Sequence, residues 1–281
     1  MDATFFKAIP KGICPGDAIE LYGEEGCGKT ELLVHFCIQC ILPNHWKSFD
    51  ISGKEAKVVF IDTDYKFPLW RVVNILENTL RSVYGNQKQK TSQTADEQSS
   101  FNTNEANEFV KSCLERLFLI RCPSSHNLSK TLGSVESLLH ENPDICLLVV
   151  DSMSAFYWTD RTIGGDTRSQ QEFNQREIIR KLKILQQTYH IVVIATKSAI
   201  MNPNYQTVSN SVKITQNASV TWKHDEYLSQ DWNKYLTYRF VVKKHQDNFI
   251  IGNTVYTSAL LDDRSCSECR FVVKDSGLEY I

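Results

Sequence analysis

The residues best suited to chemistry lie in the segment Gly23–Thr30, which reads Gly-Glu-Glu-Gly-Cys-Gly-Lys-Thr. Its spacing is G-x-x-x-x-G-K-[ST], the pattern of a phosphate-binding loop. Gly26 and Gly28 allow backbone turns that point successive N–H groups at phosphate oxygens. Lys29 supplies a positive charge for the β- and γ-phosphates, and the Thr30 hydroxyl can bind Mg²⁺. The predicted nucleotide-binding residues are Gly23, Glu24, Glu25, Gly26, Cys27, Gly28, Lys29 and Thr30, with ATP and Mg²⁺ as the expected ligands.

The residues on either side predict the elements that must position this loop. Ala18–Tyr22 is a short run typical of a buried strand, and Glu31–Leu42 reads as a helix that Pro43 ends. A helix that begins at the loop directs its free N–H groups and the positive end of its dipole toward a bound anion. This strand–loop–helix context argues against a chance match in a glycine-containing turn.

Two carboxylates follow apolar strands farther along the chain. The apolar run Ile145–Asp151 indicates a buried parallel strand that carries Asp151 to the loop, where Thr30 and Asp151 form the predicted Mg²⁺ site. Asp64 ends the segment Ile61–Asp64, at a place where a water-activating base would lie. Aspartate also ends strands and caps helices, so a purely structural role for Asp64 stays open.

Composition limits the classes of protein to consider. The 281 residues are 42% hydrophobic and 23% charged, which suits one large α/β domain with a full core. The net charge is 31 − 33 = −2, so any contact with nucleic acid must come from a local patch. The odd number of scattered cysteines, 9, favours a reducing compartment. No apolar run reaches about 18 residues, so we expect no membrane span.

The order of strand and helix patterns along the chain predicts an α/β core with a C-terminal hairpin and one insertion. Alternating strand and helix patterns place a mostly parallel sheet, flanked by helices, within residues 12–281. A turn at Asp275–Gly277 predicts a C-terminal antiparallel hairpin. The stretch 85–108 is rich in Gln, Asn, Ser and Thr, which predicts a flexible insertion.

Residues 1–11 form a predicted N-terminal arm. Phe5 and Ala8 in this arm are candidates for docking onto a partner, with the phenyl ring in a pocket and the small alanine beside it. The alternative is that Phe5 and Phe6 fold back onto the core of their own chain.

Three segments resemble the ATPase core of the RecA/RadA-type recombinases, and among them the paralogues of the eukaryotic strand-exchange recombinase. The first is Gly12-Ile13-x-x-Gly16-x-x-x-Glu20-Leu21-x-Gly23, which leads into the loop. The second is Ile61–Asp64 with Phe67 and Arg71, and the third is Leu147–Ser152 with Ala155–Tyr157.

The resemblance implies a RecA-like P-loop NTPase fold and a role in homologous-recombination repair of DNA double-strand breaks and stalled replication forks. It implies a heteromeric complex with other recombinase paralogues, support of recombinase filament assembly on single-stranded DNA, and a nuclear location. Single-stranded or branched DNA is the implied substrate, contacted directly or through the complex.

Two loops line the DNA channel in recombinase filaments, and they follow the strands that correspond to Ile145–Asp151 and Ile191–Ala195. Arg161 and Arg168 lie after the first of these strands and are the DNA-contact candidates. From Arg161 to Lys183 there are six Arg and Lys residues against three Asp and Glu residues, which suits phosphate contact. A solvated helix face is an equal alternative. In the same filaments an F-x-x-A segment docks onto the neighbouring protomer, which supports the docking interpretation of Phe5 and Ala8.

Departures from the recombinase pattern concern hydrolysis. The family has Glu where this chain has Asp64, and Asp is one methylene shorter. The family's γ-phosphate-sensing Gln aligns with Lys197 or Ser198. Residues 1–11 also leave no room before Gly12 for the helical N-terminal domain of full recombinases. We therefore expect ATP binding with weak or partner-dependent hydrolysis.

Two other functional classes stay open at this point. One is a freestanding P-loop enzyme, either a DNA-dependent ATPase or a small-molecule kinase. The other is a scaffold whose nucleotide site is vestigial.

Overall fold

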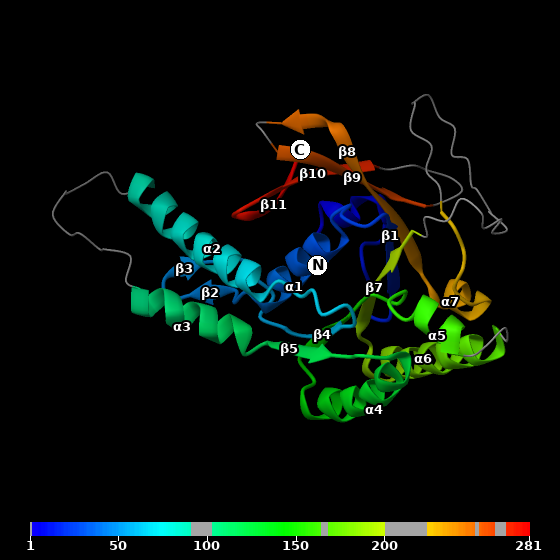
Figure 1. The fold of residues 1–281 in the computed structure, drawn as a ribbon. Coiled ribbons are helices and arrows are strands. Elements are labelled where there is room, and N and C mark those ends of the chain that lie inside the picture. The colour runs from blue at the N-terminus through cyan, green and yellow to red at the C-terminus, as the bar shows by residue number, and fades with distance from the viewer. Residues whose placement is uncertain (1, 91–102, 164–167, 200–223, 251–252, 262–267) are drawn as a thin grey trace.

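A nine-stranded sheet runs through the part of the chain that the computed structural model describes, residues 2–90, 103–163, 168–199, 224–250, 253–261 and 268–281. The order across the sheet is β11-β10-β9-β8-β1-β7-β6-β4-β5 (Figure 1). The strands are β1 Ala18–Gly23, β4 Lys57–Asp62, β5 Leu117–Arg121, β6 Ile145–Asp151, β7 Val192–Ser198, β8 Tyr238–Ile250, β9 Asn253–Leu260, β10 Glu268–Lys274 and β11 Gly277–Tyr280. The short strands β2 (His45–Trp46) and β3 (Phe49–Asp50) pair separately.

Six neighbouring strands, β8, β1, β7, β6, β4 and β5, pair in parallel. Strands β9, β10 and β11 continue the sheet beyond β8 with antiparallel pairing. This confirms the predicted mostly parallel sheet. The predicted C-terminal hairpin corresponds to β10 and β11, and it is the last part of a larger antiparallel extension that starts at β8. Parallel strands bring their carboxyl ends to one edge, so β1, β4, β6 and β7 all end beside the phosphate-binding loop.

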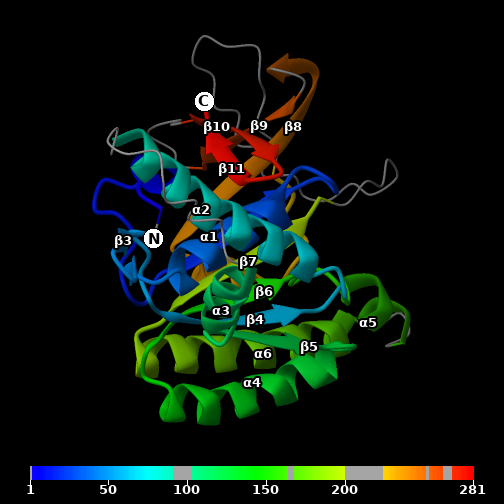
Figure 2. The same cartoon turned by 90° about the vertical axis from the view of Figure 1, so that its left-hand side faces the viewer.

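Helices cover both faces of the sheet. They are α1 Lys29–Ile41, α2 Leu69–Lys90, α3 Thr103–Leu114, α4 Ser125–Glu141, α5 Tyr157–Ile163, α6 Arg168–Tyr189 and α7 Gln230–Tyr235, with a short 3₁₀ helix at Phe5–Ala8. Figure 2 shows α1 and α2 above β4 and β5, and α4 and α6 below these strands. Alternate strand residues serve the two layers, because successive side chains point to opposite faces.

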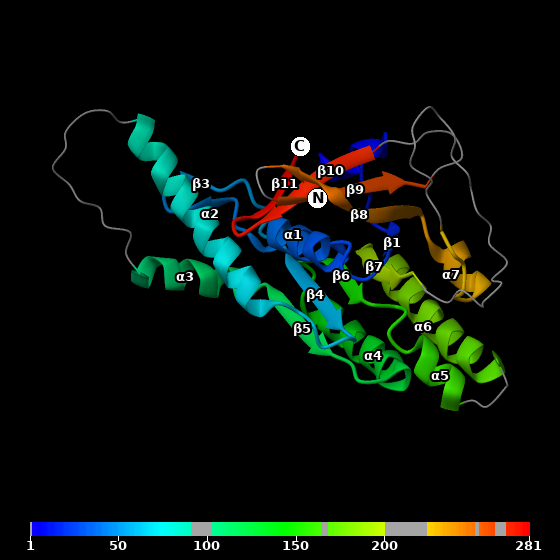
Figure 3. The same ribbon diagram turned by 45° about the horizontal axis from the view of Figure 1, so that its top comes forward.

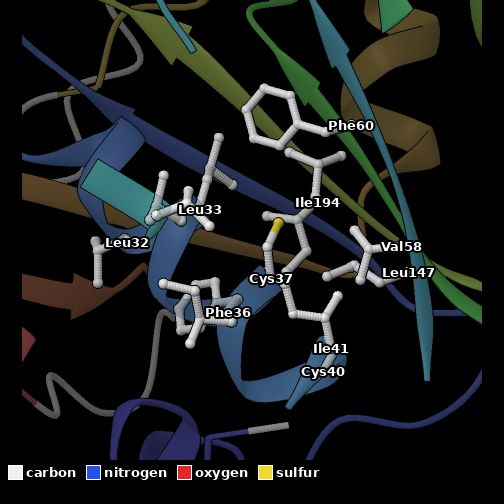
Figure 4. Packing of buried hydrophobic residues seen from close by; sticks show 14 of the residues in the cluster. Leu32, Leu33, Phe36, Cys37, Cys40, Ile41, Val58, Phe60, Leu147 and Ile194 are labelled. Atoms are coloured by element: carbon white, nitrogen blue, oxygen red, sulfur yellow. The ribbon is translucent and has the colours of Figure 1, made fainter. Parts of the chain in front are cut away.

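Helix α1 is the centre of one of these layers. Its apolar side chains, among them Leu33, Phe36 and Cys37, pack against Phe60 of β4 and Ile194 of β7 (Figure 4). Burial of nearly a whole helix face fixes the direction in which the N-terminus of α1 points. That N-terminus is where the phosphate-binding loop ends.

Helices occupy both ends of the predicted insertion at 85–108. Helix α2 continues to Lys90, and α3 already begins at Thr103, so polar composition at these positions is compatible with helix. Figure 3 shows α2 and α3 extending past the edge of the sheet. Residues 91–102, the middle of the predicted insertion, lie outside the described part of the chain.

The N-terminal arm packs onto its own chain. Phe5 is 1% exposed, and its ring lies 5.1 Å from that of Phe36 on α1 and 4.9 Å from that of Phe240 on β8. The carboxylate of Asp2 accepts hydrogen bonds from Tyr280 and contacts His35, which ties the arm to β11 and α1. In this structure Phe5 is therefore not presented to a partner, and half-buried Ala8 packs against the same core. Burial of both phenyl rings agrees with the alternative interpretation, in which Phe5 and Phe6 fold back onto the core of their own chain, and docking onto a partner stays a prediction.

Candidate nucleotide-binding site

The phosphate-binding loop joins β1 to α1 through glycines in unusual backbone conformations. Gly26 and Gly28 have φ values of +74° and +92°, which side chains with a Cβ rarely adopt. Gly23 lies against β8, since a Cβ there would be 2.3 Å from the carbonyl oxygen of Val242. Close packing and backbone direction thus require the glycines of the motif, and α1 begins immediately after them, at Lys29.

A cavity of about 620 Å³ opens in front of this loop. Its walls come from the loop and from the carboxyl ends of the neighbouring strands. The lining residues include Glu25, Gly26, Gly28, Lys29, Thr30, Asp64, Asp151, Ser198 and Tyr256. Of the other predicted loop residues, Cys27 is buried and Glu24 is exposed. The cavity is wide enough for a nucleotide, for which pockets of about 300–1,000 Å³ are usual.

Lys29 lies at the base of the cavity and is 8% exposed. Its Nζ donates hydrogen bonds to the carbonyl oxygens of Gly23 at 2.8 Å and Glu24 at 2.7 Å. Both acceptors belong to the loop, and the described part of the chain offers no carboxylate within salt-bridge distance of Lys29. The ammonium group can therefore serve a phosphate without first breaking an ion pair.

Thr30 and Asp151 meet across the cavity although 121 positions separate them. The Thr30 hydroxyl donates to Asp151 Oδ2 at 2.8 Å, and the Thr196 hydroxyl donates to Oδ1 of the same carboxylate. Burial raises the pKa of Asp151, and these hydrogen bonds offset only part of that effect. A buried carboxylate beside a hydroxyl is an oxygen pair of the kind that Mg²⁺ prefers, so the residues fit this ion.

Asp64 faces the same cavity from the end of β4. Its Oδ2 accepts a hydrogen bond from the Ser152 hydroxyl at 3.4 Å. Burial and the nearby charge of Asp151 raise the pKa of Asp64. The position suits a group that orients water next to a phosphate, and the short side chain keeps the carboxylate close to the strand.

Comparison with known proteins places the chain in a family. A family model described as Rad51 matches residues 3–113 and 103–220. The chain belongs to the Rad51 family. The DNA repair protein XRCC2 of Mus musculus is 33% identical over 265 residues, which cover 94% of this chain and 85% of the mouse protein. The DNA repair protein XRCC2 homolog of Arabidopsis thaliana is 26% identical over 83% of this chain and 70% of its own length. The human DNA repair protein RAD51 homolog 2 is 27% identical over 68% of this chain and 43% of its own length.

The resemblance to recombinases predicted that Lys197 or Ser198, at the end of β7, stands where the family has a γ-phosphate-sensing Gln. Strand β7 extends through both residues, beyond the predicted end at Ala195. Ser198 lines the cavity, where its backbone N–H donates to Ser154 Oγ at 3.0 Å. Lys197 points the other way and is fully buried. Neither residue offers a side-chain amide to the cavity.

Lys197 instead belongs to a buried ionic cluster that sequence reasoning missed. Its Nζ lies 3.1 Å from Glu226 and 3.9 Å from Glu20 on β1. Arg239 of β8 donates to Glu20 at 2.6 Å, and Trp232 and His224 also contact that carboxylate. Burial would raise the pKa of Glu20, but Lys197, His224 and Arg239 together lower it to about 2. A glutamate in the middle of an otherwise apolar strand was the signal available in the sequence.

Of the two DNA-contact candidates, only Arg161 has a described side chain. Arg161 lies on α5, donates to the Tyr157 hydroxyl at 3.3 Å and stands 5.9 Å from the ring of Trp158. Trp158 and Tyr157 line the cavity, so Arg161 is near the nucleotide site. Arg168 begins α6, and its side chain lies outside the described residues.

Proposed function

We propose that this protein binds ATP with Mg²⁺ and acts as a recombinase paralogue in homologous-recombination repair of DNA. It works as a subunit of a heteromeric complex with other recombinase paralogues, which supports recombinase filament assembly on single-stranded DNA at double-strand breaks and stalled replication forks. The similar mouse and Arabidopsis proteins are named DNA repair proteins, which supports the repair role and a nuclear location. No helix in the described part of the chain is both long and apolar enough to cross a membrane.

The observation that carries the proposal is the meeting of Thr30 and Asp151 beside Lys29 at the N-terminus of α1. The N–H groups from Gly26 to Thr30 would bind phosphate oxygens, and Lys29 would add its positive charge. Thr30 and Asp151 would hold the metal. Mg²⁺ neutralises part of the triphosphate charge when it is bound.

Slow turnover follows from the groups around the γ-phosphate end of the cavity. Asp64 is the candidate base, but its carboxylate is one methylene short of the family's glutamate, and a displacement of about 1 Å can cost on the order of a hundredfold in rate. Neither Lys197 nor Ser198 supplies the sensing amide. Nucleotide therefore acts mainly in assembly, and partner subunits supply what hydrolysis requires.

Lys29→Ala tests the nucleotide part of this function. We expect ATP affinity to fall on the order of 100-fold, because a charge-assisted contact to the phosphates is lost. Lys111→Ala, at an exposed position of α3, is the matched control and should bind ATP normally. If Lys29→Ala still co-purifies with recombinase paralogues and restores repair in cells, the site is vestigial and the proposal is wrong on this point.

A steady-state ATPase assay with and without single-stranded DNA tests the subunit role. The isolated chain should turn over ATP slowly in both conditions. Robust DNA-stimulated turnover by the isolated chain would instead identify a freestanding DNA-dependent ATPase. Substitution of Arg161 by Ala, assayed in the assembled complex, tests direct DNA contact by this subunit.

A further inference from the structure

Acidic side chains outnumber basic ones around the cavity. Within the described residues, the cationic side chains that line it are those of Lys29 and Lys66. Four acidic residues line it as well: Glu25, Glu31, Asp64 and Asp151. Arg71 of α2 pairs with Glu31, and the other three carboxylates face the two lysines. A triphosphate adds more negative charge than one Mg²⁺ balances, so a second lysine near the phosphates matters for binding.

Lys66 lies in a turn whose backbone is fixed directly after β4. The carboxylate of Asp62, which is 1% exposed, accepts hydrogen bonds from the N–H groups of Lys66 at 3.1 Å and Phe67 at 3.0 Å. Tyr65 has a φ of +58°, and the ring of Phe67 packs against that of Phe60 with centroids 4.6 Å apart. The turn therefore holds the backbone of Lys66 at the cavity while its side chain stays free to move.

The partner of the Lys66 side chain belongs to the phosphate-binding loop. Its Nζ lies 3.1 Å from Oε1 of Glu25, and the two side chains are 67% and 88% exposed. An ion pair this open to water contributes little stability and is exchanged easily. The hydrogen bond to Glu25 raises the pKa of Lys66, and the charges of Asp64 and Asp151 add to this. Lys66 is therefore cationic at physiological pH and lies within electrostatic range of both aspartates.

We propose that Lys66 binds the γ-phosphate of ATP and leaves Glu25 when the nucleotide enters the site. The inference rests on the proposed nucleotide binding. Glu25 is the third residue of the phosphate-binding loop, so an ammonium group that reaches it is already beside the place of the phosphates. The flexible four-carbon stem of a lysine allows the short move, and a phosphate carries more charge than the carboxylate it replaces.

This contact makes Lys66 a residue that selects the triphosphate. ADP lacks the γ-phosphate, so in its presence Lys66 keeps its pair with Glu25. The contact forms before any hydrolysis, so it raises affinity for ATP without by itself raising turnover. A site of this kind favours ATP over ADP while hydrolysis stays slow, which suits a nucleotide that acts in assembly.

The test measures the dissociation constants of Mg·ATP and Mg·ADP for the full chain by titration calorimetry. Lys66→Met should weaken ATP about tenfold, the size of one charge-assisted contact, and change ADP less than about twofold. Lys66→Arg keeps the charge and should retain most of the affinity for ATP. Lys111→Met removes another exposed lysine, on α3, and should leave both constants unchanged. Thermal unfolding without nucleotide checks that each variant is folded.

Glu25→Gln distinguishes a phosphate contact from support of the loop. If Lys66 binds the phosphate, this substitution removes its competitor and a repelling charge, and ATP should bind a few-fold more tightly. If the pair between Lys66 and Glu25 instead holds the loop in shape, Glu25→Gln and Lys66→Met should both weaken ATP. The two substitutions thus shift the affinity in opposite directions under the proposal.

The outcomes separate this inference from the proposed function beneath it. Equal weakening of ATP and ADP by Lys66→Met, or no change in either, overturns the role of Lys66 and leaves nucleotide binding intact. Weaker binding of ATP by Glu25→Gln overturns it as well. If wild type binds neither nucleotide, the site itself is wrong and the role of Lys66 falls with it.

Discussion

Asp151 and Glu20 are two buried carboxylates on central parallel strands, and their surroundings differ in charge. Asp151 on β6 is 8% exposed, faces the cavity, and receives hydrogen bonds from two neutral hydroxyls. Glu20 on β1 is 0% exposed and is surrounded by Lys197, Arg239 and His224. Burial raises the pKa of both carboxyl groups, but only at Glu20 do neighbouring cations reverse the effect.

The difference teaches how a binding site can be told from a structural ion cluster. A buried carboxylate whose charge is not balanced by the protein is stabilised when a cation binds, so it marks a ligand site. A carboxylate already balanced by neighbouring cations has no unbalanced charge to offer a ligand, and its removal leaves those cations unpaired.

Glu20→Gln should lower the free energy of unfolding by about 3–5 kcal/mol, because it leaves fully buried Lys197 and partly buried Arg239 with one carboxylate fewer. Urea unfolding followed by fluorescence measures the change. Glu279→Gln is the matched control: Glu279 is 56% exposed and pairs with Lys274, so less than about 1 kcal/mol should be lost. Equal losses in the two variants would contradict a special role for the buried cluster.

Acid should remove the same stabilisation. The pKa of Glu20 is lowered from 4.5 to about 2 in the folded protein, so the stabilisation is complete above pH 4.5 and is lost as pH falls through about 2. We expect about 3 kcal/mol of stability to disappear over this range beyond the loss seen in Glu20→Gln. Parallel pH dependence of the unfolding free energy in wild type and Glu20→Gln would show that Glu20 titrates normally.

Asp151→Asn should have the opposite signature. Without nucleotide its stability should be unchanged or higher by up to about 1 kcal/mol, because a buried and unbalanced charge is removed. Affinity for ATP in the presence of Mg²⁺ should fall on the order of 10- to 100-fold, while affinity without Mg²⁺ changes little. A loss of stability as large as that of Glu20→Gln would place Asp151 with the structural carboxylates.

Asp64→Glu should produce the smallest effect. The added methylene moves the carboxylate toward the γ-phosphate end of the cavity, and we expect about a tenfold rise in ATP turnover. Asp64→Asn keeps the size of the side chain without its charge and serves as the control. Turnover that is identical in Asp64→Glu and wild type would mean that Asp64 has only a structural role at the end of β4.

Local sequence determined the part of the site that consists of contiguous backbone. The loop Gly23–Thr30 and its helix could be recognised because consecutive residues supply the N–H groups that bind a phosphate, so the site appears as a contiguous sequence motif. Asp151 could be found because an apolar strand with a terminal carboxylate is itself a local pattern. The parallel order of the core followed from the alternation of strands and helices.

Tertiary structure decided what depends on distant segments. Glu20 acquires its cations from β7 and β8, and Tyr256 reaches Gly28 from a strand near the end of the chain. Phe5 and Ala8 match the F-x-x-A pattern of a docking motif, yet Phe5 packs against Phe36 in the core of its own chain. The sequence could not predict these outcomes, because the burial and charge balance of a residue depend on all its neighbours in space, and many of those neighbours are distant in the sequence.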